Sequence, residues 1–287
     1  MIKEFFEILF AADVPFLRYA LFVGLIGSVP LGITGSFVVS RNITGVAGAM
    51  SHAVLGGVGF ALYANRVWAV SWLTPFGGAM LGALLAAVLV YFASLYAKEK
   101  EDTVISGVWA LGMSLGVLFI AATPGYTDLQ GYLFGNILLV SGREIIITAV
   151  LSALVLVLTA IFFRPLQMML FDSEFARLRN INVNFLYFLL LILIALTVVL
   201  MVNVAGVILL IALLSLPAAT AKCYVRHLSS MMLVGVLISM SEITLGLFVG
   251  YTWDLPVGPA AVLCAVLLYV IALLKNRFLP SGNSKND

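Results

Sequence analysis

The long apolar runs of this chain constrain its fold more than any other feature. A helix needs about 20 mainly apolar residues to cross the hydrocarbon core of a bilayer. Because backbone groups in lipid must be paired within their own segment, such runs are expected to be helices. The chain is therefore predicted to be a polytopic membrane protein of the all-α class. Nine hydrophobic segments follow one another, at 18–40, 46–64, 76–97, 104–122, 144–163, 185–202, 205–221, 229–251 and 257–274.

The chain is predicted to cross the membrane eight or nine times. The segment at 205–221 is the weakest of the nine, because it barely reaches spanning length and Pro217 falls in its last turns. A further apolar stretch at 129–140 is too short to cross and suits a re-entrant or interfacial segment. The expected architecture is a transmembrane helical bundle of eight or nine spans plus a short re-entrant segment.

Composition leaves room for little besides a membrane domain. Hydrophobic residues make up 63% of the chain and charged residues 10%, whereas soluble domains carry about 25% charged residues. We therefore expect a single transmembrane domain over residues 1–287, with no soluble catalytic domain. The net charge of only +2 argues against a nucleic-acid partner. The two cysteines, Cys223 and Cys264, lie far apart and match no disulfide or metal-binding pattern.

The two ends of the chain differ from the spans. Residues 1–17 could form a short amphipathic helix on the lipid surface, with Phe5, Phe6 and Phe10 on its apolar side. Acidic residues interrupt this segment, so it is not expected to be a signal peptide. The polar tail at 278–287 is predicted to be disordered.

The basic residues predict the orientation in the membrane, because cytoplasmic loops carry an excess of lysine and arginine. We expect the 164–184 loop and the C-terminus in the cytoplasm and the N-terminus outside, which requires an odd number of crossings. With this orientation, all but four of the 15 basic residues are cytoplasmic. The four outside are Lys3, Arg18, Arg66 and Arg143.

Two ionisable residues stand out well inside predicted spans, where burying a charge costs about 2.5–3.5 kcal/mol or more. His52 lies in the second segment and Glu242 in the eighth. Imidazole and carboxylate together suit zinc or manganese. Counted along their helices, His52 is about 9 Å and Glu242 about 20 Å from the inner end of its segment, so the two could be separate points on one path. Alternatively, His52 could simply hydrogen-bond a neighbouring helix, and Glu242 could be protonated or paired with Arg18 or Arg143.

The predicted cytoplasmic loop at 164–184 contains a helix-start signal. Asp172 or Ser173 can cap a helix, and Glu174 is favourable in its first turn. Arg177 is favourable in the last turn, and Asn180 can adopt the left-handed conformation that ends a helix. Such a helix could dock a soluble motor protein, or it could lie on the membrane surface.

Several short motifs, taken in order, resemble the permease subunits of bacterial ABC importers for zinc, manganese and iron. The resemblance runs from about residue 18 to residue 275. Each motif is weak alone, but six in the right order are specific. The matching segments are 50–55 (MSHAVL), 101–103 (EDT), 132–138 (YLFGNIL), 171–176 (FDSEFA), 213–221 (LLSLPAATA) and 254–259 (DLPVGP).

The resemblance implies a pore-forming transport subunit in the bacterial inner membrane. A cytoplasmic ABC ATPase would dock on the 164–184 loop, and an extracytoplasmic metal-binding protein would deliver zinc, manganese or iron. The pore would form with a second copy or a related permease, and no cofactor would be permanently bound. His52 and Glu242 would coordinate the passing metal transiently. The expected coupling residues are Phe171, Asp172, Ser173, Glu174, Phe175, Ala176 and Arg177.

The sequence also departs from the family pattern. The aspartate expected four residues before the histidine is Gly48 here, and Gly56-Gly57 replaces a proline-glycine pair. No Gly-x-x-x-x-Gly-Lys-Ser/Thr motif is present, so ATP hydrolysis is expected on a separate chain.

Two other classes of function remain open at this point. A proton-coupled secondary metal transporter could use Glu242 as its proton carrier. An intramembrane enzyme is disfavoured, because adjacent residues such as Ser51 and His52 do not face each other on a helix.

Overall fold

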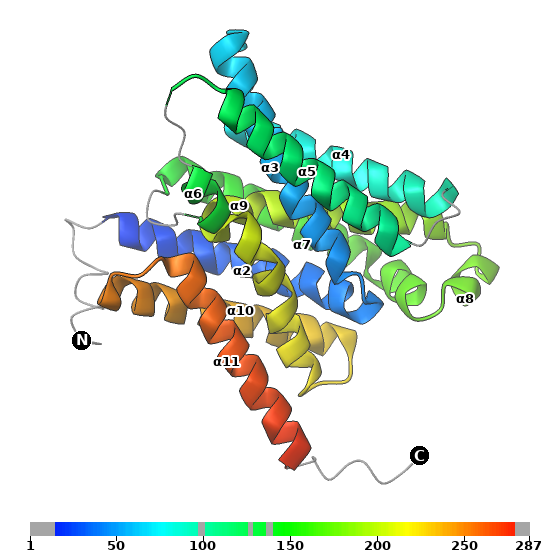
Figure 1. Cartoon of the computed structure of the whole chain (residues 1–287). Coiled ribbons are helices and arrows are strands. Elements are labelled where there is room, and N and C mark those ends of the chain that lie inside the picture. Colours follow the sequence, from blue (N-terminus) through cyan, green and yellow to red (C-terminus); the bar gives the residue numbers. More distant parts are fainter. Residues whose placement is uncertain (1–14, 97–100, 126–128, 136–139, 279–287) are drawn as a thin grey trace.

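The computed structural model describes residues 15–96, 101–125, 129–135 and 140–278. All regular elements in these residues are helices, which confirms the all-α prediction (Figure 1). Residues 1–14 of the predicted surface helix lie outside the described residues, as do residues 279–287 of the tail. The helices are α2 (Pro15–Arg41), α3 (Thr44–Val67), α4 (Pro75–Tyr96), α5 (Glu101–Ala122), α6 (Leu129–Phe134), α7 (Gly142–Phe171), α8 (Ser173–Leu178), α9 (Val183–Lys222), α10 (Leu228–Trp253) and α11 (Val257–Phe278).

Eight helical segments in the described residues are long and apolar enough to cross a membrane. They agree with eight of the nine predicted segments. The ninth, predicted at 205–221, corresponds to the shorter apolar helix Gly206–Lys222. It forms the second half of α9, after a break at Gly206, whose φ of 75° and ψ of 163° are not helical. Glycine adopts such a φ without the steric penalty that a side chain would add.

Both ends of α9 lie on the same face of the molecule. Near its start, the Tyr187 ring lies 4.7 Å from the guanidinium of Arg41, at the end of α2. Just past its end, the Cys223 carbonyl accepts a hydrogen bond of 2.9 Å from Asn276, at the end of α11. Ser40, at the end of α2, lies 3.8 Å from Met231, near the start of α10. Because α10 begins shortly after α9 ends, this contact places the two ends of α9 on the same face. We call this the α8 face.

The break in α9 lies at the opposite end of the bundle. Gly206 packs against the backbone of Leu133, Phe134 and Gly135, at the end of α6. We call this end the α6 face. The chain therefore runs from the α8 face to the α6 face before Gly206 and returns to the α8 face after it. Accordingly, α2 begins near α6 (Figure 1), and α11 ends beside the end of α9, at the α8 face.

The predicted 20-residue loop at 164–184 is largely helical, which corrects the expected end of the fifth span. Helix α7 continues through Arg164 and Pro165 to Phe171. A proline inside a transmembrane helix is tolerated where local adjustments satisfy the freed backbone groups. The stretch at 129–140 does not cross, as predicted: α6 has only six residues, and residues 136–139 lie outside the described ranges.

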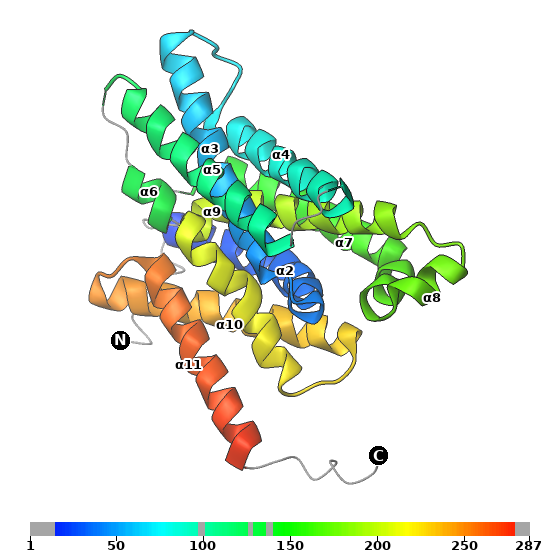
Figure 2. The same ribbon diagram turned by 45° about the vertical axis from the view of Figure 1, so that its right-hand side comes forward.

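The helices form two groups around a central pair. Helices α3, α4 and α5 pack together on one side, α10 and α11 lie on the other, and α2 and α9 run between them (Figure 2). Glycines allow the closest approaches: Gly57 of α3 meets the backbone of Gly78 and Gly82 on α4. Small residues at helix contacts allow this close backbone approach, as is common in membrane helices.

Candidate functional site

His52 lies inside the group of α3, α4 and α5 and is only 5% exposed. Its ring stacks on Trp109 of α5, with 4.8 Å between centroids and 23° between planes. Its Nδ1 atom is buried without a hydrogen-bond partner among the described residues. The alternative of a histidine that bonds a neighbouring helix through this atom is therefore not what the structure shows.

Trp109 occupies the space beside Gly48, where the resembling family has an aspartate. A Cβ atom at position 48 would lie 2.5 Å from a ring carbon of Trp109 and 3.1 Å from Cδ1 of Ile211. Contacts this short force a neighbour to move. Trp109 was not among the predicted site residues, because in the sequence it is only an aromatic residue within a span.

Glu242 is fully buried in α10, with an exposed fraction of 0%. Neither carboxylate oxygen has a hydrogen-bond partner among the described residues. The expected alternative, pairing with Arg18 or Arg143, is therefore not seen. An unpaired buried carboxylate is costly, so this one requires a proton or a cation for compensation.

The structure does not bring His52 and Glu242 together. The main contacts of α3 are with α4, α5 and α9, and those of α10 are with α2, α9 and α11. The second half of α9 lies between them: Ile211 faces Gly48 of α3, and Leu213 packs on Ala261 and Ala265 of α11. Residues two apart on a helix point about 200° apart, so these contacts lie on opposite sides of the helix.

The two residues also lie at different depths. Both α3 and α10 start at the α8 face. His52 lies about 12 Å along α3 and Glu242 about 21 Å along α10. Together with the intervening α9, this makes them two separate positions within one chain. No group of three or more potential metal ligands occurs among the residues that the structure describes.

Ser51 offers no nucleophile to His52. Its hydroxyl donates a hydrogen bond of 2.8 Å to the carbonyl of Ala47, one turn earlier on the same helix. The pair therefore lacks the direct hydrogen bond that a nucleophile and its base require.

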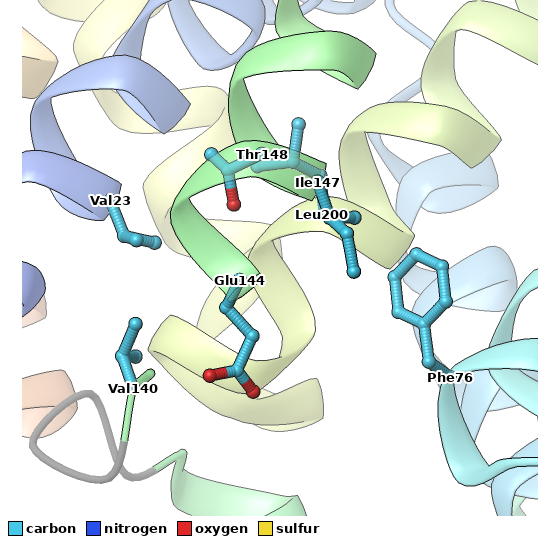
Figure 3. Close-up of a pocket in the computed structure, with 7 residues that line it drawn as sticks. All are labelled: Val23, Phe76, Val140, Glu144, Ile147, Thr148 and Leu200. Atoms are coloured by element: carbon cyan, nitrogen blue, oxygen red, sulfur yellow. The ribbon is translucent and has the colours of Figure 1, made fainter. Parts of the chain in front are cut away.

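A second carboxyl group, partly exposed, lies at the α6 face. Glu144, in the first turn of α7, lines a cavity of about 20 Å³ (Figure 3), which has room for about one water molecule. Its carboxylate accepts a hydrogen bond of 2.6 Å from the backbone N–H of Ser141. This bond caps the start of α7, so Glu144 already has a structural function. The other lining residues are Val23, Phe76, Val140, Ile147, Thr148 and Leu200.

Most of the expected coupling segment forms helix α8 at the α8 face, while Phe171 is the last residue of α7. The Asp172 carboxylate accepts a hydrogen bond of 2.8 Å from the N–H of Phe175 and so caps α8, as predicted. Asn180 has a φ of 59°, the left-handed conformation predicted at the end of the helix. Ala176 is the buried residue of α8, which anchors the helix to the bundle.

The outward side of α8 and the end of α7 form an exposed groove of about 460 Å³. Phe171 and Phe175 are 68% and 44% exposed, although aromatic rings usually avoid water. The guanidinium of Arg179 lies 5.1 Å from the centre of the Phe175 ring. Ser173, Glu174 and Arg177 are exposed beside them. The lining residues of the groove are Arg164, Gln167, Met168, Phe171, Asp172 and Phe175.

Comparisons with known proteins cover nearly the whole chain. The family model described as the ABC 3 transport family matches residues 13–276. The manganese import system permease protein ScaB of Streptococcus gordonii is 33% identical over 282 residues, 97% of this chain and 98% of that protein. The manganese transport system membrane protein MntC of Listeria innocua is 32% identical over 259 residues, 90% of each chain.

A solved structure has the same fold. PsaBC from Streptococcus pneumoniae, determined in complex with Fab, matches with a TM-score of 0.85 and 33% sequence identity. The alignment covers 97% of this chain and 99% of that one. The arrangement of helices described above is therefore shared along the full length of both proteins.

Proposed function

Because the chain belongs to the ABC 3 transport family, we propose that it is the permease subunit of an ATP-driven importer of divalent transition metals. The observation that carries this proposal is full-length similarity, in sequence and fold, to permeases of metal import systems. Manganese is the cargo named for the relatives; zinc and iron are the other candidates. The similarity favours this function over a proton-coupled secondary transporter.

In this proposal the α8 face is cytoplasmic. It carries the basic residues that end α2, α9 and α11, among them Arg41, Lys222 and Lys275, as expected of a cytoplasmic face. The start of α2, at the opposite α6 face, is then outside. An extracytoplasmic metal-binding protein would dock at the α6 face, and a second permease copy or a related permease would complete the pore.

The groove between α7 and α8 is the proposed docking site of a separate ATPase subunit. Its exposed aromatic rings, Phe171 and Phe175, supply the buried contact area that binding requires. ATP binding and hydrolysis would move α8 relative to the bundle. Since α7 runs without interruption from the α6 face to this groove, such a movement could be passed along α7 to the outer side of the pore.

His52 and Glu242 are the proposed transient ligands of the cargo. Both have buried polar atoms without a partner, which a passing cation would satisfy. Their separation suits successive binding steps, since conduction requires binding that is weak enough for release.

The test is cell-associated zinc, manganese and iron, measured by elemental mass spectrometry in a strain lacking the gene. This strain would be compared with strains that carry the intact gene, Glu242→Gln or His52→Ala at matched expression. The control is His227→Ala, since His227 is the other histidine of the chain and is exposed at the start of α10.

We expect one metal to fall in the deletion strain and in both site variants but not in His227→Ala. Loss in the deletion strain alone would preserve the transport function and refute the two site residues. Unchanged metal content in the deletion strain, with redundant uptake systems also deleted, would refute the transport function.

A further inference from the structure

Helices α10 and α11 pack closely against each other just before and just after the turn that connects them. A Cβ atom at Gly246 would collide with Ala261, and one at Gly250 would lie 2.8 Å from Cγ2 of Val257. The two helices are antiparallel, because the chain reverses between Trp253 and Val257. These contacts fix which residues of the two helices stand opposite one another.

This register places Cys264 beside Glu242. Glu242 is four residues before Gly246 on α10, and Cys264 is three residues after Ala261 on α11. At a rise of about 1.5 Å per residue, they lie about 6 Å and 4.5 Å from the contact, both toward the α8 face. Each residue turns the side-chain direction by about 100°. Glu242 therefore points about 40°, and Cys264 about 60°, away from the line that joins the two helix axes, and both point to the same side of that line.

Independent observations agree with this register. Cys264 is a free thiol of intermediate exposure. Glu242 itself is fully buried, and both of its oxygens lack partners among the described residues. One turn earlier on α10, Ser239 is also fully buried, and its hydroxyl has no partner there either. Polar atoms without partners thus gather where α10 meets α11.

We propose that the Cys264 thiolate and the Glu242 carboxylate together bind the transported cation at one step of its passage. This inference rests on the proposed function and deepens it. On binding, the thiol S–H bond breaks, a metal–sulfur bond forms and the proton leaves to water, with no change in oxidation state. Thiolate ligands favour zinc over manganese. The proposed site therefore offers the cation a soft ligand beside Glu242. The carboxylate that the family pattern has four residues before the histidine is absent, because that residue is Gly48.

The first test uses Co²⁺ as a spectroscopic probe for zinc, with the purified protein in lipid nanodiscs. A thiolate bound to Co²⁺ gives a charge-transfer band in the near ultraviolet, whereas carboxylate and imidazole ligands do not. We expect the band in the intact protein and in Cys223→Ser, which removes the other cysteine. It should be lost in Cys264→Ser and in Cys264→Ala, and Glu242→Gln should weaken Co²⁺ binding by about tenfold or more.

A second measurement needs no substitution at the site. Zn²⁺ should slow the alkylation of Cys264 by a maleimide in the Cys223→Ser protein, and it should do so at a lower concentration than Mn²⁺. Absence of the band from the intact protein, its persistence in Cys264→Ser, or equal protection by the two metals would overturn the proposal.

These outcomes are separable from those of the transport experiment. If the deletion strain loses a metal but no thiolate band forms, the importer function stands and the role of Cys264 is refuted. If the band forms but no metal content depends on the gene, the site binds metal and the proposed function fails. If Cys264→Ser lowers zinc uptake and leaves manganese unchanged, both proposals hold.

Discussion

Helix α8 and the interior of α3 and α10 differ in what positions their side chains. In α8, residues close in sequence fix the helix: Asp172 caps its start, and Asn180 ends it. In the interior, other helices do so: Trp109 of α5 stacks on His52 of α3, and α11 packs on α10 one turn from Glu242. Substitutions in α8 should therefore act locally, whereas interior substitutions should change function and stability together, sometimes in opposite directions.

The largest expected effect is at Glu242. Glu242→Gln should lower metal uptake by about tenfold or more, because the cation loses a charged ligand. The same variant should be at least as stable as the intact protein, because a neutral amide avoids the cost of an unpaired buried carboxylate, about 2.5–3.5 kcal/mol in a span. Uptake and the thermal unfolding midpoint in detergent measure the two effects. If the midpoint falls together with uptake, Glu242 is mainly a structural residue.

The next effect concerns Gly48. Gly48→Ala should destabilise the protein by about 1–3 kcal/mol, because the added methyl group meets the Trp109 ring in a packed interior. The double variant Gly48→Ala/Trp109→Leu should recover part of the stability that the two single variants lose together. Thermal unfolding of the four proteins gives the coupling free energy. Strictly additive losses would mean that Trp109 moves aside without cost.

The smallest effect on stability is expected at Asp172. Asp172→Ala removes the cap of α8, worth about 1 kcal/mol, but α8 is short and exposed, so the unfolding midpoint of the whole protein should not change. Uptake should fall, because the docking helix frays. Asp172→Asn should retain most of the uptake, since asparagine caps a helix as well as aspartate. If Asn fails as Ala does, the negative charge itself contacts the partner.

Much of the fold was predictable because the membrane imposes simple rules. Hydrophobic length predicted the spanning helices, and the ends of α8 followed from capping residues. The predicted end of the fifth span was wrong, because the hydrophobic run ends before Arg164 although the helix does not. In the structure α7 passes through both residues. Proline weakens a helix locally, but neighbouring turns and packing decide whether the helix ends there.

The candidate residues show where sequence reasoning stops. Burial cost alone identified His52 and Glu242, since an ionisable residue in a span needs a reason. Sequence could not predict that the second half of α9 separates them, or that Trp109 fills the space beside Gly48. These facts depend on which helix faces which, and apolar spans carry little periodicity that would predict it.

The sequence by itself determined the membrane location, the approximate spans, the capped helix α8 and the family resemblance. These depend on composition and on residues close in sequence, for which lipid and backbone hydrogen bonding allow few alternatives. Only the tertiary structure decided that α9 turns back at Gly206, that His52 and Glu242 lie apart, and that Cys264 stands beside Glu242. Such contacts join residues far apart in the chain, and close packing of side chains selects among many arrangements of equally apolar helices.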